Sequence, residues 1–153
     1  MKTRSKENKK VRNATPNVYN GIEFKSILEK SIYKNLLEAG ITPEYESETF
    51  TIWRGFKPEV PFYDRQKIRG VKMWKNTLNK KTLQDMTYTP DFIFKYHDIK
   101  VIIEAKGNEN EQFPIKKKLF RAYLETCDYP VIYAEIFTVR QLKEFLEELR
   151  LKY

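Results

Sequence analysis

The stretch YTPDFIFKYHDIKVIIEAKG, residues 88–107, holds the pattern that decides the fold of this chain. Two apolar runs rich in β-branched and aromatic residues flank the pair His97 and Asp98. Such runs around a short polar pair are typical of a β-hairpin. The sequence therefore predicts strands over 88–96 and 100–106, joined by a tight turn.

This hairpin brings charged residues together. A symmetric two-residue turn places Asp91 opposite Glu104, and Lys106 shares a face with Glu104 because side chains alternate along a strand. Their neighbours on that face, Ile93 and Ile102, are apolar. Two carboxylates in such surroundings repel each other, and one lysine cannot readily neutralise both. A hard divalent cation such as Mg²⁺ is the natural complement, and an ordinary cross-strand salt bridge is the alternative interpretation.

A helix is predicted to begin near Ser26, because Ser26 and Glu29 fit the S-x-x-E capping box, and to end at Gly40. Its apolar positions are Leu28, Ile32, Leu36 and Leu37. The spacing places Glu29 on the inward face, where a carboxylate needs a partner. Either Glu29 bonds back to the amide of Ser26, or it joins the other carboxylates, and the two roles are compatible.

The rest of the chain predicts alternating strands and helices. Residues 44–53 alternate like a strand, and residues 54–85 form a long excursion with a short helix around 72–78. Pro114 suits the first turn of a helix that runs to about residue 126. Residues 130–137 are apolar enough for a strand buried on both faces.

Thr138 and Gln141 form a second capping box, which opens a terminal helix with Leu142, Phe145, Leu146 and Leu149 facing inward. The predicted order is α-β-β-β-α-β-α. This order indicates an α/β fold with a mixed central sheet flanked by helices. We expect one domain over 19–153 after a flexible basic arm over 1–18.

The net charge of +8 is concentrated in two segments. Residues 1–12 carry a net +5 and residues 54–81 a net +7, which leaves −4 for the remainder. Such concentration favours an anionic partner, DNA above all, while a solvated lysine-rich surface is the plainer alternative.

Other classes of site and location are excluded by composition. Cys127 and His97 are the only cysteine and histidine, so neither an internal disulfide nor an ordinary zinc site is expected. No run of 18 or more apolar residues exists, and the first ten residues lack the apolar stretch of a signal peptide. We therefore expect a soluble, cytoplasmic protein with no membrane partner.

The residues around the hairpin resemble a known superfamily. Pro90-Asp91 followed by Glu104-Ala105-Lys106 is similar to the signature of PD-(D/E)xK nucleases. The flanking pattern resembles more closely a family of small proteins common in phages and related elements. The matching positions, within about residues 20–137, are Gly21, Phe24, Ser26, Glu29, Tyr88, Pro90, Asp91, Phe92, Glu104, Lys106, Gly107, Lys116 and Lys118. The excursion at 54–85 is longer than this family usually has.

The resemblance implies a restriction-endonuclease-like core, α-β-β-β-α-β with a C-terminal helix, and a Mg²⁺-dependent DNA endonuclease in which Mn²⁺ can substitute. Asp91, Glu104 and the carbonyl of Ala105 would hold the metal, and Lys106 would orient the attacking water or stabilise developing charge. Glu29 would bind a second metal or position a water. A phage-encoded enzyme would work in the host cytoplasm.

Binding to DNA is expected from both basic segments. The candidate contacts are Ser26, Arg65, Lys67, Arg69, Lys72, Lys75, Lys116 and Lys118, and solvated positions are equally compatible with the last two. Trp53, Tyr63 and Trp74 either stack on bases or pack in the core. The alternative functions are a noncatalytic nucleic-acid-binding protein with the nuclease fold and a structural protein with acidic partners. No small-molecule cofactor beyond the metal is expected, and a homodimer is left open.

Overall fold

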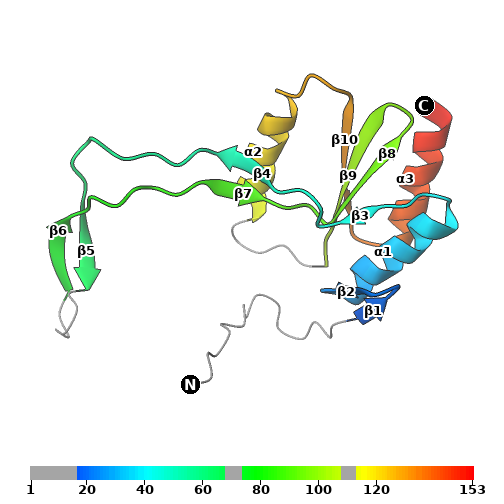
Figure 1. The fold of residues 1–153 in the computed structure, drawn as a ribbon, viewed down its shortest axis with the longest axis horizontal. Helices are drawn as coiled ribbons and strands as arrows, with labels where there is room; N and C mark the ends of the chain where they lie inside the picture. The colour runs from blue at the N-terminus through cyan, green and yellow to red at the C-terminus, as the bar shows by residue number, and fades with distance from the viewer. Residues whose placement is uncertain (1–16, 68–73, 108–112) are drawn as a thin grey trace. The chain divides into compact units, whose positions relative to one another are not determined.

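The computed structural model describes residues 17–67, 74–107 and 113–153, which contain three helices and several small sheets (Figure 1). Its internal contacts divide the chain into two compact units. Within the described residues, unit 1 comprises residues 17–47, 90–107 and 128–153, and unit 2 comprises residues 48–67, 74–89 and 113–127. The single domain over 19–153 stays a prediction.

Unit 1 is built on a four-stranded sheet with the order β10-β9-β8-β3. Its strands are β3 (Glu44–Tyr45), β8 (Phe92–Tyr96), β9 (Ile99–Ala105) and β10 (Val131–Ile136). β9 and β10 run parallel, whereas β8 is antiparallel to both β9 and β3. The sheet is therefore mixed, which confirms the predicted α/β class.

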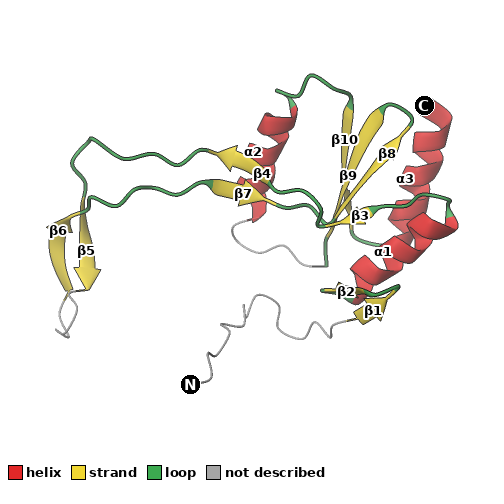
Figure 2. Cartoon of the chain, in the orientation of Figure 1, coloured by secondary structure: helices red, strands yellow, loops and turns green. Residues whose placement is uncertain are grey.

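Helices α1 (Ile27–Glu38) and α3 (Val139–Lys152) pack against this sheet and each other (Figure 2). The core joins apolar side chains of both helices to Phe92, Phe94, Val101 and Ile103 on one face of the sheet. Each fully buried Phe, Leu or Ile contributes about 1.5 to 3 kcal/mol by leaving water. The predicted inward residues Leu142, Leu146 and Leu149 are buried, and Phe145 packs against the core.

Both predicted N-cap residues are confirmed. Ser26 caps α1 by accepting from the amide of Glu29, and Thr138 caps α3 by accepting from the amide of Gln141. α1 ends at Glu38, and Gly40 follows with φ of 78°, a conformation that glycine adopts without steric cost.

A hairpin that the sequence analysis missed precedes α1. β1 (Asn17–Tyr19) pairs with β2 (Ile22–Phe24) across Asn20 and Gly21, whose φ values are 49° and 76°. Asn-Gly between short apolar runs is the strongest local signal for such a turn. The predicted flexible arm over 1–18 is therefore wrong at residues 17 and 18, while residues 1–16 lie outside the described residues.

Two predicted strands are each divided in the structure. Residues 44–53 form β3 in unit 1 and β4 (Phe50–Trp53) in unit 2, because Glu46, with φ of 46°, turns the chain out of an extended path. Residues 88–96 likewise split into β7 (Met86–Tyr88) and β8. Pro90 lies between them and has no amide hydrogen to join a ladder.

Unit 2 contains β4 paired with β7, β5 (Tyr63–Lys67) paired with β6 (Trp74–Leu78), and α2 (Phe113–Leu124). The rings of Phe50, Tyr88, Phe120 and Tyr123 form an aromatic cluster between α2 and the first strand pair. The helix expected around 72–78 is wrong, since residues 74–78 form β6. Pairing with β5 supplies the backbone bonds that a short isolated helix could not sustain.

The predicted strand over 130–137 is confirmed as β10, but not its burial on both faces. Only Ile136 is buried, and the other five residues are half-buried. The reason is the sheet order, because β10 lies at an edge and has a neighbour on one side only. None of the helices in the described ranges is long and apolar enough to cross a membrane.

Candidate active site

The register of the β8–β9 hairpin is the one predicted. Phe92 pairs with Ile103 and Ile93 with Ile102, and the turn contains His97 and Asp98. Continued by one residue, this register sets Asp91 against Glu104. The amide of Ala105 confirms the proximity of the strands, because it donates to Oδ2 of Asp91 over 2.6 Å.

Glu104 and Lys106 form a buried ion pair at the end of β9. The Nζ of Lys106 lies 2.6 Å from Oε1 of Glu104, and the side chains are only 15% and 8% exposed. Burying such a pair removes both charged groups from water, which is unfavourable. The attraction between them offsets this penalty only when their geometry is good. At this distance Lys106 and Glu104 therefore form a close ion pair.

Asp91, immediately before β8, is a member of this site whose pKa is shifted. Burial raises the pKa of Asp91 well above its ordinary value, and the charges of Glu104 and Glu29 raise it further. The amide of Ala105 and the charge of Lys106 lower the pKa but do not cancel the increase. The interaction joins Asp91, Glu104, Glu29 and Lys106 in one electrostatic cluster, which we call the acidic cluster.

Glu29 enters this cluster from the first turn of α1 and is only 7% exposed, so its predicted inward position is confirmed. Its Oε1 accepts from the hydroxyl of Ser26 at 2.7 Å. Its Oε2 accepts from the hydroxyl of Tyr45 at 2.6 Å and from the amide of Lys25 at 3.1 Å. The predicted hydrogen bond between the Glu29 carboxylate and the amide of Ser26 is wrong. The carboxylate instead accepts from the amide of Lys25, one residue earlier in the chain.

Tyr45 is the member that the sequence analysis missed. Burial and the hydrogen bond to Glu29 raise the pKa of the Tyr45 hydroxyl, so it stays protonated and continues to donate. Its ring packs on Phe24 and Phe92, with centroids 4.8 and 5.4 Å apart. Only the pairing of β3 with β8 brings Tyr45 to Glu29, and no local pattern signals it.

Glu135 is a second residue not singled out from the sequence. In the parallel ladder its Cα is the partner of Glu104, and directly paired residues project to the same face of a sheet. Its side chain is half-buried. A neighbouring carboxylate beside Glu104 adds to the negative charge on this face, and only the order of β9 and β10 could have revealed it.

The residues predicted to bind DNA are not all part of this cluster. Ser26 serves as the helix cap, and its hydroxyl is used by Glu29. Lys116 donates to the carbonyl of Thr87 at 3.2 Å, and Lys118 is exposed on α2. Both lysines belong to unit 2, whereas the acidic cluster lies in unit 1.

Arg65 is exposed on β5. Arg69 and Lys72 lie outside the described residues, as do the side chains of Lys67, Trp74 and Lys75. Trp53 and Tyr63, for which packing was the alternative to stacking, are 52% and 66% exposed. Their rings are therefore not core residues of unit 2.

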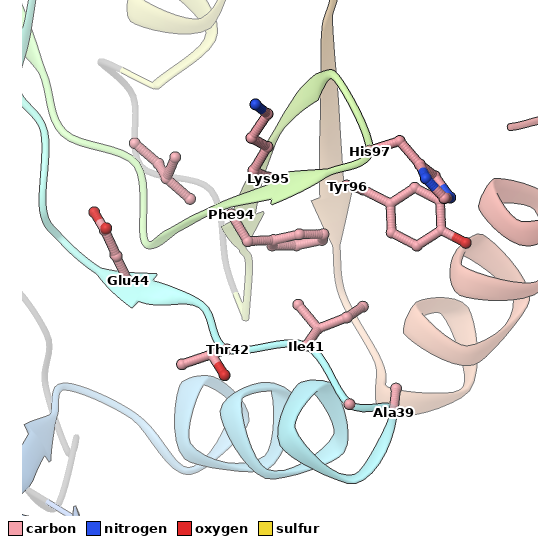
Figure 3. A pocket seen from close by; sticks show the side chains of 10 residues that line it. Ala39, Ile41, Thr42, Glu44, Phe94, Lys95, Tyr96 and His97 are labelled. Carbon is pink, nitrogen blue, oxygen red and sulfur yellow. The ribbon is translucent and has the colours of Figure 1, made fainter.

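A separate hollow of about 530 Å³ lies in unit 1, between the end of α1 and the turn of the β8–β9 hairpin (Figure 3). Tyr96 and His97 line it with their rings 4.7 Å apart, together with Glu44 and Lys95. No residue of the acidic cluster lines this hollow. With a single carboxylate it offers no comparable chemistry.

The acidic cluster contains carboxylate oxygens, the kind of donor atom that Mg²⁺ prefers. Among the described residues, no three His, Cys, Asp or Glu side chains are arranged to hold one metal ion. Mg²⁺ is usually held by only one or two carboxylates, with water and substrate phosphate completing its octahedral shell. Asp91 and Glu104 match that smaller requirement by type and number.

Comparison with known proteins identifies a family for this chain. The model of a family described as Protein of unknown function (DUF1064) matches residues 8–144, so the chain belongs to this family. No curated protein and no solved structure matches the chain.

Proposed function

We propose that this DUF1064 protein is a Mg²⁺-dependent DNA endonuclease of the PD-(D/E)xK type. One observation carries the proposal: Asp91, Glu104, Glu29 and Lys106 interact at one end of the mixed sheet. Structural ion pairs balance opposite charges, whereas in this cluster Asp91 faces the charges of two other carboxylates and only one lysine. A buried carboxylate whose pKa is raised by burial and by neighbouring charges, as that of Asp91 is, is typical of catalytic sites.

The order of elements supports a restriction-endonuclease-like core. α1, β3, β8, β9, α2 and β10 follow the α-β-β-β-α-β order that the resemblance implies, and α3 is the C-terminal helix. The elements β4 to β7 then constitute an insertion between the first and second core strands. This insertion accounts for the unusual length of the excursion at 54–85.

Each residue of the acidic cluster has a role in this proposal. Asp91 and Glu104 would hold Mg²⁺, which when bound lowers the pKa of water and offsets charge on the phosphate. Lys106, released from part of its interaction with Glu104, would orient the attacking water or stabilise negative charge as it develops. Hydrogen bonds from Tyr45 and Ser26 hold the Glu29 carboxylate in place. From there Glu29 would position a water molecule by accepting a hydrogen bond from it.

Nicking of supercoiled plasmid by the purified protein tests the proposal. We expect nicked and linear products with Mg²⁺ or Mn²⁺ and none with EDTA. Asp91→Asn should remove the activity, whereas Asp98→Asn, in the exposed turn of the same hairpin, should keep it. Metal-independent nicking, or equal nicking by both variants, would contradict the proposal.

A noncatalytic DNA-binding protein is the second candidate, favoured by the exposed basic residues of unit 2. Gel retardation of the same plasmid fragment in EDTA measures binding alone. Retardation without any metal-dependent cleavage, over a panel of linear, flap, branched and four-way DNA, would decide for this second function.

A further inference from the structure

Residues 50–67 and 74–88 of unit 2 run side by side as a two-stranded antiparallel ribbon, which we call the ribbon. β4 pairs with β7 near its base and β5 with β6 further out. Between them Phe56 bridges Leu83, and the amide of Asn79 donates to the carbonyl of Phe62 at 2.7 Å. Backbone pairing therefore recurs along the ribbon from β4 and β7 to β5 and β6, which distinguishes it from a loose loop.

The first strand of the ribbon carries extra residues near its middle. Phe56 and Phe62 are bonded to partners at Leu83 and Asn79, so a longer stretch on the first strand faces a shorter one on the second. Pro58 and Pro61 lie within that longer stretch. Unpaired residues and prolines force the strand to bulge, which leaves neighbouring side chains without cross-strand cover.

The ribbon concentrates exposed apolar side chains. Of the fifteen large exposed apolar residues within the described ranges, eight lie on it. Four are aromatic, with exposures of 50% to 66%: Trp53, Phe56, Phe62 and Tyr63. Exposed apolar surface on this scale marks a site that contacts something else.

The same ribbon is strongly basic. Its residues 50–67 and 74–88 contain seven Lys and Arg against three Asp and Glu. Two of the acids are engaged within the ribbon, where Asp64 accepts from Asn79 at 2.9 Å and Asp85 from the amide of Gly55 at 2.7 Å. The exposed cations among its described side chains are Arg54, Lys57, Arg65, Lys80 and Lys81.

The exposed cations and the exposed aromatic rings of the ribbon together indicate which kind of partner it would bind. A second copy of the ribbon would bring the same positive charge against itself, which like-charge repulsion disfavours. A nucleic acid supplies both the phosphates for the cations and flat surfaces for the rings. In a paired duplex the base faces are covered by stacking, so only unpaired nucleotides offer them freely.

We propose that the ribbon holds unpaired nucleotides of DNA, with bases stacked on Trp53, Phe56, Phe62 and Tyr63 and phosphates on the neighbouring cations. Resting on the proposed nuclease function, this assigns DNA with a single-stranded segment as the substrate class. The acidic cluster then supplies cleavage, and the ribbon supplies the preference for DNA structure.

Binding in EDTA tests the ribbon separately from catalysis. Fluorescence anisotropy of the full chain would compare a duplex containing a central unpaired bubble with the fully paired duplex of equal length. Loss of one stacking ring lowers affinity about fivefold to about a hundredfold. We expect such losses on bubble DNA for Trp53→Ala, Phe62→Ala and Tyr63→Ala, with little change on paired DNA. Phe137→Ala and Tyr153→Ala, exposed aromatics of unit 1, are the matched controls.

Stacking has a direct spectroscopic signature. Trp74→Phe leaves Trp53 as the only tryptophan of the chain. Addition of an oligothymidylate should then quench the emission of Trp53 at salt concentrations that weaken phosphate contacts but not stacking. Tryptophan emission that does not change at saturating oligonucleotide would overturn the stacking assignment.

Three outcomes overturn the proposal. They are unchanged bubble affinity in the ring variants, equal losses on paired and bubble DNA, and dissociation of a dimer by these substitutions without loss of bubble affinity. With Mg²⁺, the wild type should cut bubble DNA faster than paired DNA, and the ring variants should lose that preference. Ring-dependent bubble binding without any cleavage would support the ribbon assignment and reject the nuclease.

Discussion

The acidic cluster of unit 1 and the ribbon of unit 2 satisfy opposite physical conditions. In the cluster, Glu29 and Glu104 are 7% and 6% exposed and their oxygens have specific partners. In the ribbon, cations and rings project into water. Burial makes the charges of the cluster strong and fixes their geometry, which chemistry requires. Exposure leaves the ribbon free to contact a long polymer, which binding requires.

Because the two regions differ in this way, substitutions in each should change different measured quantities. Substitutions in the cluster should change the rate of bond cleavage and the response to metal, with DNA affinity nearly preserved. Substitutions in the basic segments should change affinity and its dependence on salt, with the rate of cleavage of bound DNA preserved. A cluster variant that changes DNA affinity, or a basic-segment variant that changes the rate of cleavage of bound DNA, would show that the two roles are not separate at that residue.

The largest effect is expected for the two carboxylates of the hairpin. Asp91→Ala and Glu104→Ala should each abolish detectable cleavage, because each removes a proposed ligand of the metal, while DNA affinity stays within a few-fold. Single-turnover cleavage and gel retardation on the same preparations measure both quantities. Substantial Mg²⁺-dependent cleavage by both variants would remove the site assignment.

The next effect concerns the lysine, which separates an enzyme from a protein that merely binds metal. Lys106→Ala should lower single-turnover cleavage by about a hundredfold to a thousandfold, the loss typical for one transition-state donor. Binding of Mn²⁺ should hold or tighten, since Glu104 loses its ion pair. Lys106→Arg should rescue poorly, because a planar guanidinium does not replace a compact ammonium.

Lys95→Ala, in the same hairpin and largely exposed, is the matched control for the lysine. It should behave as the wild type in both measurements. Normal cleavage by Lys106→Ala with metal still bound would leave Lys106 as a structural ion-pair residue only.

A smaller effect is expected for Tyr45, which acts through Glu29. Tyr45→Phe removes the 2.6 Å hydrogen bond and should lower cleavage by about tenfold, the value of one bond to a charged group. It should also raise the Mg²⁺ concentration that gives half-maximal rate. Tyr33→Phe, a buried ring that packs on Phe24 and Phe92, is the control. Equal behaviour of the two variants would reduce Tyr45 to a packing residue.

The basic arm should affect binding alone. Deletion of residues 1–12, with a net charge of +5, should weaken DNA binding and leave the rate of cleavage of bound DNA unchanged. Each lost phosphate contact should reduce the log-log salt dependence of affinity by about 0.9 on duplex DNA. A salt titration of wild type and truncated protein measures the slope, and identical slopes would mean that the arm does not touch the backbone.

The smallest effect is on stability without metal. Because the pKa of Asp91 is raised in the folded state, the fold retains a proton that the unfolded chain releases. The free energy of unfolding should therefore fall as pH rises from the ordinary carboxyl pKa through the raised one. Asp91→Asn should lack this loss. Urea denaturation in EDTA at several pH values within this range measures the free energy of unfolding, with Asp98→Asn as the control. The same pH dependence of this free energy in wild type and Asp91→Asn would contradict the raised pKa of Asp91.

Some features of this protein follow from local sequence. The hairpin register follows from alternation around His97 and Asp98, and the helix starts follow from Ser26 and Thr138. The inward position of Glu29 follows from helical periodicity. These features depend on neighbours within a few residues, so the chemistry of each residue is enough to predict them. Asn20-Gly21 belongs to the same class and was predictable from its turn signal.

Other features were decided only by tertiary structure. The split of 44–53 and 88–96 between two units, the strand at 74–78, and the edge position of β10 all depend on pairing between distant segments. Tyr45 reaches Glu29, and Glu135 lies beside Glu104, through ladders that local periodicity does not encode. Strand order and partner choice are set by the free energy of the whole sheet, in which non-local contacts outweigh local preference.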